Sequence, residues 1–129
     1  MTSDNLHAQW DFAKKKFDDF AEHGMVKVYT SGSLLEDREI PLDFQETVLR
    51  DCHELGKELV IESRTEQCNE EKLEWATKIN PNFTVAIGLE ALDDEVLRFH
   101  VNKGFSVKSW YRAVENLKRF DLRVKTYLM

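Results

Sequence analysis

The feature that most constrains the fold is a short apolar run, Thr84 to Ile87, which is followed by Gly88. Its residues are rich in β-branched side chains and do not alternate with polar ones. Such a run is typical of a strand covered on both faces, as in a parallel sheet flanked by helices. The loop after such a strand lies where ligands bind in open α/β sheets and α/β barrels.

Helical and extended patterns alternate along the rest of the chain. Apolar residues from Leu6 to Phe20 recur at helical spacing, with Gly24 as the expected C-cap, and Gly56 is expected to end a second helix. Further helix signals and apolar runs follow the same rules. Helices are predicted at 6–23, 42–55, 70–79, 93–103 and 106–120, and strands at 25–30, 58–63, 83–90 and 123–129.

This order of elements predicts the α/β class, with a four-stranded parallel sheet joined by right-handed crossovers. Residues 1–129 are expected to form a single domain that is part of a (β/α) barrel, resembling the middle of a larger one. A part-barrel cannot close, so its outer strands expose unpaired backbone groups and its inner face exposes apolar side chains. We expect a homodimer through the sheet edge at residues 123–129.

The composition predicts a soluble cytoplasmic protein. Charged residues make up 33% of the chain and hydrophobic residues 42%, and no apolar run approaches membrane-spanning length. The net charge of −6 argues against a broad phosphate-binding surface, because nucleic-acid affinity depends on clustered Lys and Arg. The two cysteines, Cys52 in a helical pattern and Cys68 in a polar loop, lack metal-ligand spacing, so we predict reduced thiols and no metal site.

Polar residues follow three successive predicted strands, in the blocks 30–33, 62–64 and 88–90. Because the carboxyl ends of parallel strands share one edge of a sheet, these loops predict a ligand site. For Glu90 taken alone, a simple lead into the next helix is the favoured alternative, since acidic residues suit a first helical turn. The serines 31, 33 and 63 are interpreted as hydrogen-bonding loop residues, because no nucleophile elbow surrounds them.

Other site classes lack their motifs. No Gly-x-Gly-x-x-Gly turn or P-loop is present, which argues against a nucleotide-binding Rossmann domain or an NTPase. The aromatic residues Trp10, Trp75, Trp110 and Tyr111 lie at helical spacing and are expected to pack in the core rather than to stack on bases.

Four blocks of the chain resemble consecutive core segments of radical S-adenosylmethionine (radical SAM) enzymes. They are "KVYTSGSLLEDREIP", "ELVIESRTE", "VAIGLEALDDEVLRFHVNKGFSVKSWYRAVENLK" and "VKTYLM". The chain is most similar to the archaeal family that includes the archaeosine-biosynthesis radical enzyme. This resemblance implies an iron–sulfur oxidoreductase-like barrel that acts in tRNA modification, with tRNA or another tRNA-modification protein as a partner.

The resemblance also implies S-adenosylmethionine as cofactor and suggests which residues bind it. The loop Thr30, Ser31, Gly32 and Ser33 matches the segment that approaches the methionine part of the cofactor. Glu62 and Arg64 match the end of the third barrel strand, and Glu90 matches the position that holds the ribose hydroxyls. Carboxylates and hydroxyls are suitable hydrogen-bonding groups for these roles.

The chain departs from this family in one decisive motif. Family members hold a [4Fe–4S] cluster with three cysteines at Cys-x3-Cys-x2-Cys spacing, and this sequence has no such run. Thr65 also stands where the family pattern has proline. Two hypotheses follow. The chain is either the central fragment of a radical SAM enzyme, inactive alone and without a catalytic residue of its own, or a stand-alone, non-catalytic α/β binding or interaction domain derived from one.

Overall fold

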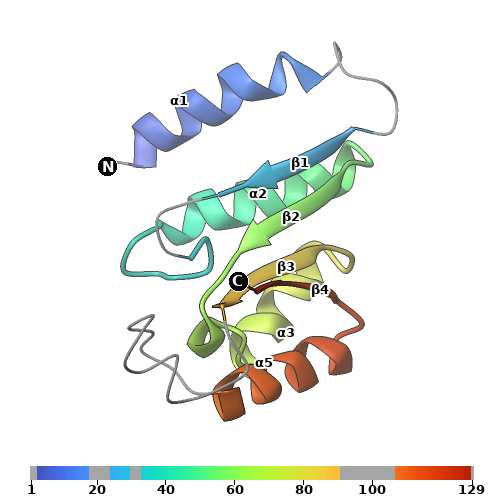
Figure 1. The fold of residues 1–129 in the computed structure, drawn as a ribbon. Helices are drawn as coiled ribbons and strands as arrows, with labels where there is room; N and C mark the ends of the chain where they lie inside the picture. The colour runs from blue at the N-terminus through green and yellow to red at the C-terminus, as the bar shows by residue number, and fades with distance from the viewer. Residues whose placement is uncertain (1–2, 18–23, 30–32, 91–106, 129) are drawn as a thin grey trace.

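The computed structural model describes residues 3–17, 24–29, 33–90 and 107–128, and these form an α/β fold (Figure 1). Its four α-helices and four strands alternate along the chain. The elements are α1 (Ser3–Lys14), β1 (Met25–Val28), α2 (Leu42–Glu54), β2 (Glu58–Glu62), the 3₁₀ helix η2 (Thr65–Gln67), α3 (Glu70–Ile79), β3 (Thr84–Glu90), α5 (Val107–Arg119) and β4 (Arg123–Leu128).

The strands form one sheet in the order β1-β2-β3-β4, and all three neighbouring pairs are parallel. Pairing begins with Met25 opposite Glu58 and continues with Val60 opposite Thr84 and Thr84 opposite Arg123. A register shift interrupts the β3–β4 pairing between Gly88 and Glu90. The prediction of a four-stranded parallel sheet in sequence order is therefore confirmed.

Helices α2, α3 and α5 pack on one face of this sheet (Figure 1). Alternation along each strand directs one set of side chains toward these helices. The resulting core is apolar, and its fully buried members include Leu49, Leu59, Ile61, Leu73, Val85, Ile87 and Leu117. No described helix covers the opposite face of the sheet.

The end of α2 shows how local sequence determines an element boundary. Gly56 has φ of +65°, a conformation that costs glycine little because it has no Cβ. The Gly56 N–H donates to the His53 carbonyl and the Lys57 N–H donates to the Cys52 carbonyl, which is the Schellman arrangement. The prediction that Gly56 ends this helix is confirmed.

Several sequence-based expectations need correction or cannot be placed. Tyr111 is 56% exposed, so the prediction that it packs in the core is wrong; the apolar stripe of α5 passes through Trp110, Ala113 and Leu117 instead. Cys68 lies in the predicted loop, between η2 and α3, but its side chain is buried. The helix expected at 93–103 lies outside the described residues. No described helix is long and apolar enough to cross a membrane.

Candidate functional site

The carboxyl ends of all four strands lie along one edge of the sheet, where the arrowheads point in Figure 1. Of the predicted site residues, Thr30, Ser31 and Gly32 lie outside the described residues. Glu90 ends β3 and pairs with Leu128 through its backbone, but its side chain is also outside the description. Ser33, Glu62 and Arg64 can be placed.

Ser33 joins the loop after β1 to the loop after β2. Its hydroxyl, fully buried, donates to Ser63 Oγ at 3.1 Å, and Ser63 Oγ in turn donates to the Arg64 carbonyl at 2.9 Å. The Leu34 N–H donates to the Glu62 carbonyl at 3.2 Å, which adds a second contact between this loop and the end of β2. The described contacts of Ser33 therefore hold the two loops together, and its role toward a cofactor stays a prediction.

The thiol of Cys68 lies beside this serine pair, 3.7 Å from Ser63 Oγ. Burial raises the pKa of the Cys68 thiol to about 11, and burial likewise raises the pKa of Cys52 to about 12. Both thiols are protonated at neutral pH, so neither is an activated nucleophile or a ready thiolate ligand.

Glu62 and Arg64 have different surroundings although they are close in sequence. Glu62 is half-buried at the end of β2 and shares a register row with Ala86 and Lys125. Arg64 is exposed and pairs with Glu39 at 3.6 Å, on the loop that precedes α2. The Arg64 side chain therefore forms an ion pair with Glu39. The Glu62 side chain, at the end of β2, belongs to the sheet face instead.

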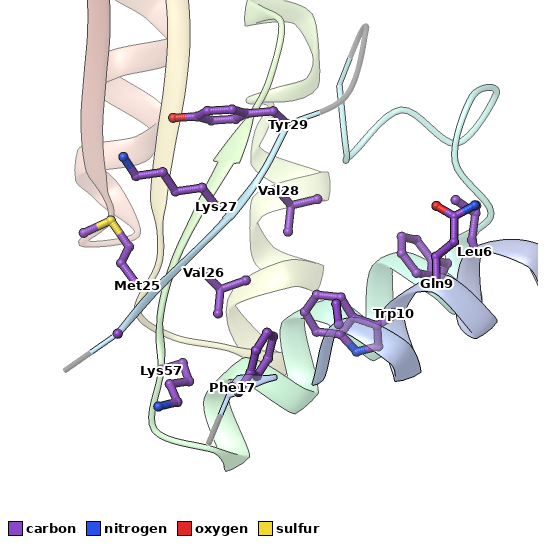
Figure 2. A pocket seen from close by; sticks show the side chains of 13 residues that line it. Leu6, Gln9, Trp10, Phe17, Met25, Val26, Lys27, Val28, Tyr29 and Lys57 are labelled. Atoms are coloured by element: carbon purple, nitrogen blue, oxygen red, sulfur yellow. The ribbon is translucent and has the colours of Figure 1, made fainter. Parts of the chain in front are cut away.

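The sheet face opposite the helices carries polar side chains, and we call it the open face. Register and alternation place the following residues on it: Met25, Lys27, Tyr29, Glu58, Val60, Glu62, Thr84, Ala86, Gly88, Arg123, Lys125 and Tyr127. Figure 2 shows Lys27 and Tyr29 on the side of β1 opposite to Val26 and Val28. The expectation of an apolar inner face holds only in part for the described residues. Val60 and Ala86 are buried and Met25 is 49% exposed, but Lys27 lies in the register row of Val60, and Glu62 and Lys125 lie in that of Ala86.

A tyrosine pair spans the open face from one outer strand to the other. The hydroxyls of Tyr29, just after β1, and Tyr127, on β4, lie 3.0 Å apart. The hydrogen bond with Tyr29, together with desolvation and the nearby negative charge of Glu62, raises the pKa of Tyr127. Sequence reasoning missed this pair; the available signal was that both tyrosines stand at the carboxyl ends of outer strands.

The open face is locally cationic although the chain carries a net charge of −6. Among the side chains that the structure describes, it presents three cationic groups, Lys27, Arg123 and Lys125, and two carboxylates, Glu58 and Glu62. Arg123 lies 4.0 Å from Glu58, and Lys125 Nζ lies 5.2 Å from the centre of the Tyr127 ring. A face with this balance attracts a carboxylate or phosphate group and offers an acceptor for hydroxyl or ammonium groups.

The described residues contain no group of three His, Cys, Asp or Glu side chains arranged as metal ligands. The open face offers carboxylate, ammonium and phenol groups, which can bind an organic ligand that has both charged and hydroxyl groups.

Three archaeal proteins are similar to this chain. An uncharacterized protein of Methanocaldococcus jannaschii is 32% identical over 136 residues, which cover 100% of this chain and 37% of that protein. Archaeosine synthase subunit beta of Methanosarcina acetivorans is 33% identical over 126 residues, covering 95% of this chain and 36% of that protein. The same subunit of Thermococcus kodakarensis is 34% identical over 108 residues, covering 81% of this chain and 33% of that protein. The chain is similar to archaeosine synthase subunit beta.

The chain spans about a third of the length of these curated relatives. No protein-family model matches it, and no solved structure does. Two of these relatives are named as a subunit.

Proposed function

We propose that this chain binds S-adenosylmethionine as part of a radical SAM protein that acts in archaeosine tRNA modification. The observation that carries the proposal is its 33–34% identity to two proteins named archaeosine synthase subunit beta. The parallel sheet with polar carboxyl ends supports a place within a (β/α) barrel, whose ligands bind at that end. A tRNA or tRNA-modification partner and a homodimer through the β4 edge belong to the same proposal.

The open face has groups that suit each part of S-adenosylmethionine. Lys27 and Lys125 can bind the methionine carboxylate, and the Glu62 carboxylate can accept from the ammonium or from ribose hydroxyls. Tyr29 and Tyr127 offer aromatic rings for the adenine, and the small residues Ala86 and Gly88 allow close approach to the sheet. The loop 30–32 and Glu90 complete the set that we assign to this ligand.

The residues present do not fit a [4Fe–4S] cluster. Such a cluster needs cysteine thiolates, whereas Cys52 and Cys68 are both buried and protonated. When bound to an enzyme of this class, the cluster supplies the electron for cleavage of the cofactor. These 129 residues contribute binding and orientation, and we assign no electron-transfer step to them.

The first prediction concerns the iron content of the chain. After anaerobic reconstitution with iron and sulfide, the purified chain is expected to stay colourless and to leave S-adenosylmethionine uncleaved under reducing conditions. Iron analysis, visible absorption and chromatography of the nucleoside products measure this. Stoichiometric iron that is lost in a Cys52→Ser, Cys68→Ser double variant would contradict the prediction.

The second prediction tests the binding face. Replacing Glu62 by Gln should weaken S-adenosylmethionine binding by about 10-fold to 100-fold, because a hydrogen bond to a charged group contributes about 1.5–3 kcal/mol. Chemical-shift titration by NMR measures the affinity and shows which residues respond. The matched control is Glu74→Gln on α3, whose carboxylate pairs with Lys78 at 3.5 Å away from the open face.

Equal affinities for the wild type and Glu62→Gln, or shifts confined to the helical side of the sheet, would contradict the assignment. The second hypothesis, a non-catalytic binding or interaction domain, is favoured by the two buried thiols. It predicts no response of the open face to S-adenosylmethionine at millimolar concentration.

A further inference from the structure

The outward side of α5 is basic, although the chain as a whole carries a net charge of −6. We call this side the α5 face; its exposed residues are Lys108, Tyr111, Arg112, Glu115, Lys118 and Arg119, four cations and one carboxylate among them. The exposed residues of α2 and of α3 have the opposite balance, with three carboxylates and one Lys or Arg on each helix. On α1 they include two carboxylates and no Lys or Arg.

Helix stability alone does not explain where the cations of α5 lie. Lys118 and Arg119 stand in the last turn, where positive charge interacts favourably with the helix dipole. Lys108 stands in the first turn, where positive charge is unfavourable, and α5 has no acidic residue there. Helices α1, α2 and α3 each have at least one acidic residue in the first turn. A cation that breaks this rule points to a role in binding.

The cations of the α5 face are also available to a partner. Exposed cations on the neighbouring helices form ion pairs: Arg50 lies 3.6 Å from Glu46, and Lys78 lies 3.5 Å from Glu74. Among the residues that the structure describes, no ion pair involves a cation of α5. The positive charge of this face is therefore not neutralised by the described part of the chain.

Three of these cations form one stripe along the helix. Lys108, Arg112 and Arg119 are separated by four and seven positions, so they lie within about 40° of one another around the helix axis. They span about 16 Å along that axis. A stripe of this length suits a chain of phosphate groups better than a single small anion, because each cation can contact a different phosphate.

An exposed aromatic ring stands beside the stripe. Tyr111 is 56% exposed and meets Trp110 edge-on, with 4.9 Å between the ring centres. The inner side of the helix is held in place, since Trp110 Nε1 donates to Thr126 Oγ1 at 3.2 Å and Asn116 Nδ2 donates to the Cys68 carbonyl at 3.0 Å. Cations beside an exposed aromatic ring are the groups with which proteins bind RNA, through its phosphates and its unstacked bases.

The chemistry of the α5 face favours RNA over a protein partner. Its exposed residues include no aliphatic side chain, whereas the centre of a protein–protein interface is poor in charged residues and more apolar. The proposed function includes a tRNA partner, and the choice of RNA rests on that proposal.

We propose that the α5 face binds the sugar–phosphate backbone of an RNA strand. Lys108, Arg112 and Arg119 contact phosphates along the helix, and Tyr111 stacks on an unpaired base beside them. The phosphate contacts position the RNA without reading its sequence. Helix α5 packs on the helical side of the sheet (Figure 1), so this surface is separate from the open face to which S-adenosylmethionine is assigned.

Fluorescence anisotropy with an in vitro tRNA transcript tests this surface. Replacing Lys108 and Arg112 together by Gln should weaken binding about tenfold or more. It should also lower the slope of log affinity against log salt concentration by about 1.5, because each phosphate contact contributes about 0.7–0.9 to that slope. The matched control replaces Arg50 and Lys78 by Gln, which removes the same charge from α2 and α3 and should leave both quantities unchanged.

Two further variants separate stacking from charge. Tyr111→Ala should weaken binding about fivefold or more, the usual effect of losing one stacked base, and should leave the salt slope unchanged. The exchange Lys108→Arg, Arg112→Lys keeps both charges and should bind the transcript like the wild type. Ultraviolet cross-linking followed by mass spectrometry should attach the RNA to Tyr111.

Thermal unfolding of each variant verifies that it is folded. The proposal is overturned if the transcript does not bind, if the α5 and control variants lose equal affinity, or if the RNA cross-links to Tyr29 or Tyr127 instead. It is also overturned if polyglutamate binds as tightly as the transcript, because the face would then suit acidic proteins. The S-adenosylmethionine titration reads the open face, so its failure would contradict the proposed cofactor site and leave the α5 result standing.

Discussion

Replacing Phe83 by alanine is expected to lower the free energy of unfolding by about 3–5 kcal/mol, the usual cost of truncating a buried phenylalanine. Phe83 precedes β3 and is only 1% exposed, so its loss leaves a cavity in the helix-covered core. A domain of this size has a total stability of about 5–15 kcal/mol. Chemical denaturation followed by circular dichroism measures the change.

Phe12→Ala is the matched control, because Phe12 is 64% exposed on α1. Removal of a ring that is mostly in water should change the stability by no more than about 0.5 kcal/mol. If the two variants unfold at the same denaturant concentration, Phe83 is not part of a close-packed core, and the packing described for β3 is wrong.

Replacing Asp51 by alanine is expected to destabilise the protein by about 1–3 kcal/mol and to release α1 from α2. The substitution leaves the indole N–H of Trp10, a residue only 6% exposed, without its acceptor, and an unpaired buried donor has a cost of this size. Lys14 loses the same carboxylate. A red shift of tryptophan fluorescence before global unfolding would show the release of α1.

The contribution of Asp51 should also depend on pH. Burial opposes ionisation, but the hydrogen bonds from Lys14 and Trp10 outweigh it, so the pKa of Asp51 in the folded protein lies below its usual value. A lowered folded-state pKa stabilises the protein fully above the unfolded pKa, about 3.9, and this stabilisation is lost as the pH falls through the folded pKa. The difference between wild type and Asp51→Ala should therefore be constant near neutral pH and shrink below about pH 4.

Asp11→Ala serves as the control for this pair. Asp11 lies 3.4 Å from Lys14, but its side chain is 66% exposed, and exposed ion pairs contribute little. The Asp11 variant should differ from wild type by no more than about 0.5 kcal/mol at any pH. An equal loss of stability in the two variants would contradict this prediction. It would show that the buried contacts of Asp51 contribute no more to stability than the exposed Lys14–Asp11 ion pair.

The local sequence was sufficient to predict most of the secondary structure and the topology. The β-branched run from Thr84 to Ile87 predicted a strand of a parallel sheet, and this is confirmed, but the described helices cover one face of that strand and not both as predicted. The glycine at position 56 predicted the end of α2, because few other residues adopt its backbone conformation easily. The parallel order followed from the alternation of helix and strand alone.

The tertiary structure decided how the predicted groups are used. Ser33 and Ser63 are 30 positions apart, and only their packing shows that one hydroxyl donates to the other. Tyr29 and Tyr127 meet although 98 positions separate them. Contacts of this kind depend on register and on side-chain direction, and a periodic pattern in the sequence carries neither.

The sequence by itself therefore determined the elements and their order, because helix and strand periodicity and special backbone conformations are local properties. Only the tertiary structure decided that the open face is cationic and phenolic, that Arg64 pairs with Glu39, and that α1 stands away from β1 over an apolar cavity. Each of these features arises because residues that are distant in the chain come together on one surface. Their energies depend on burial and distance, which the fold alone creates.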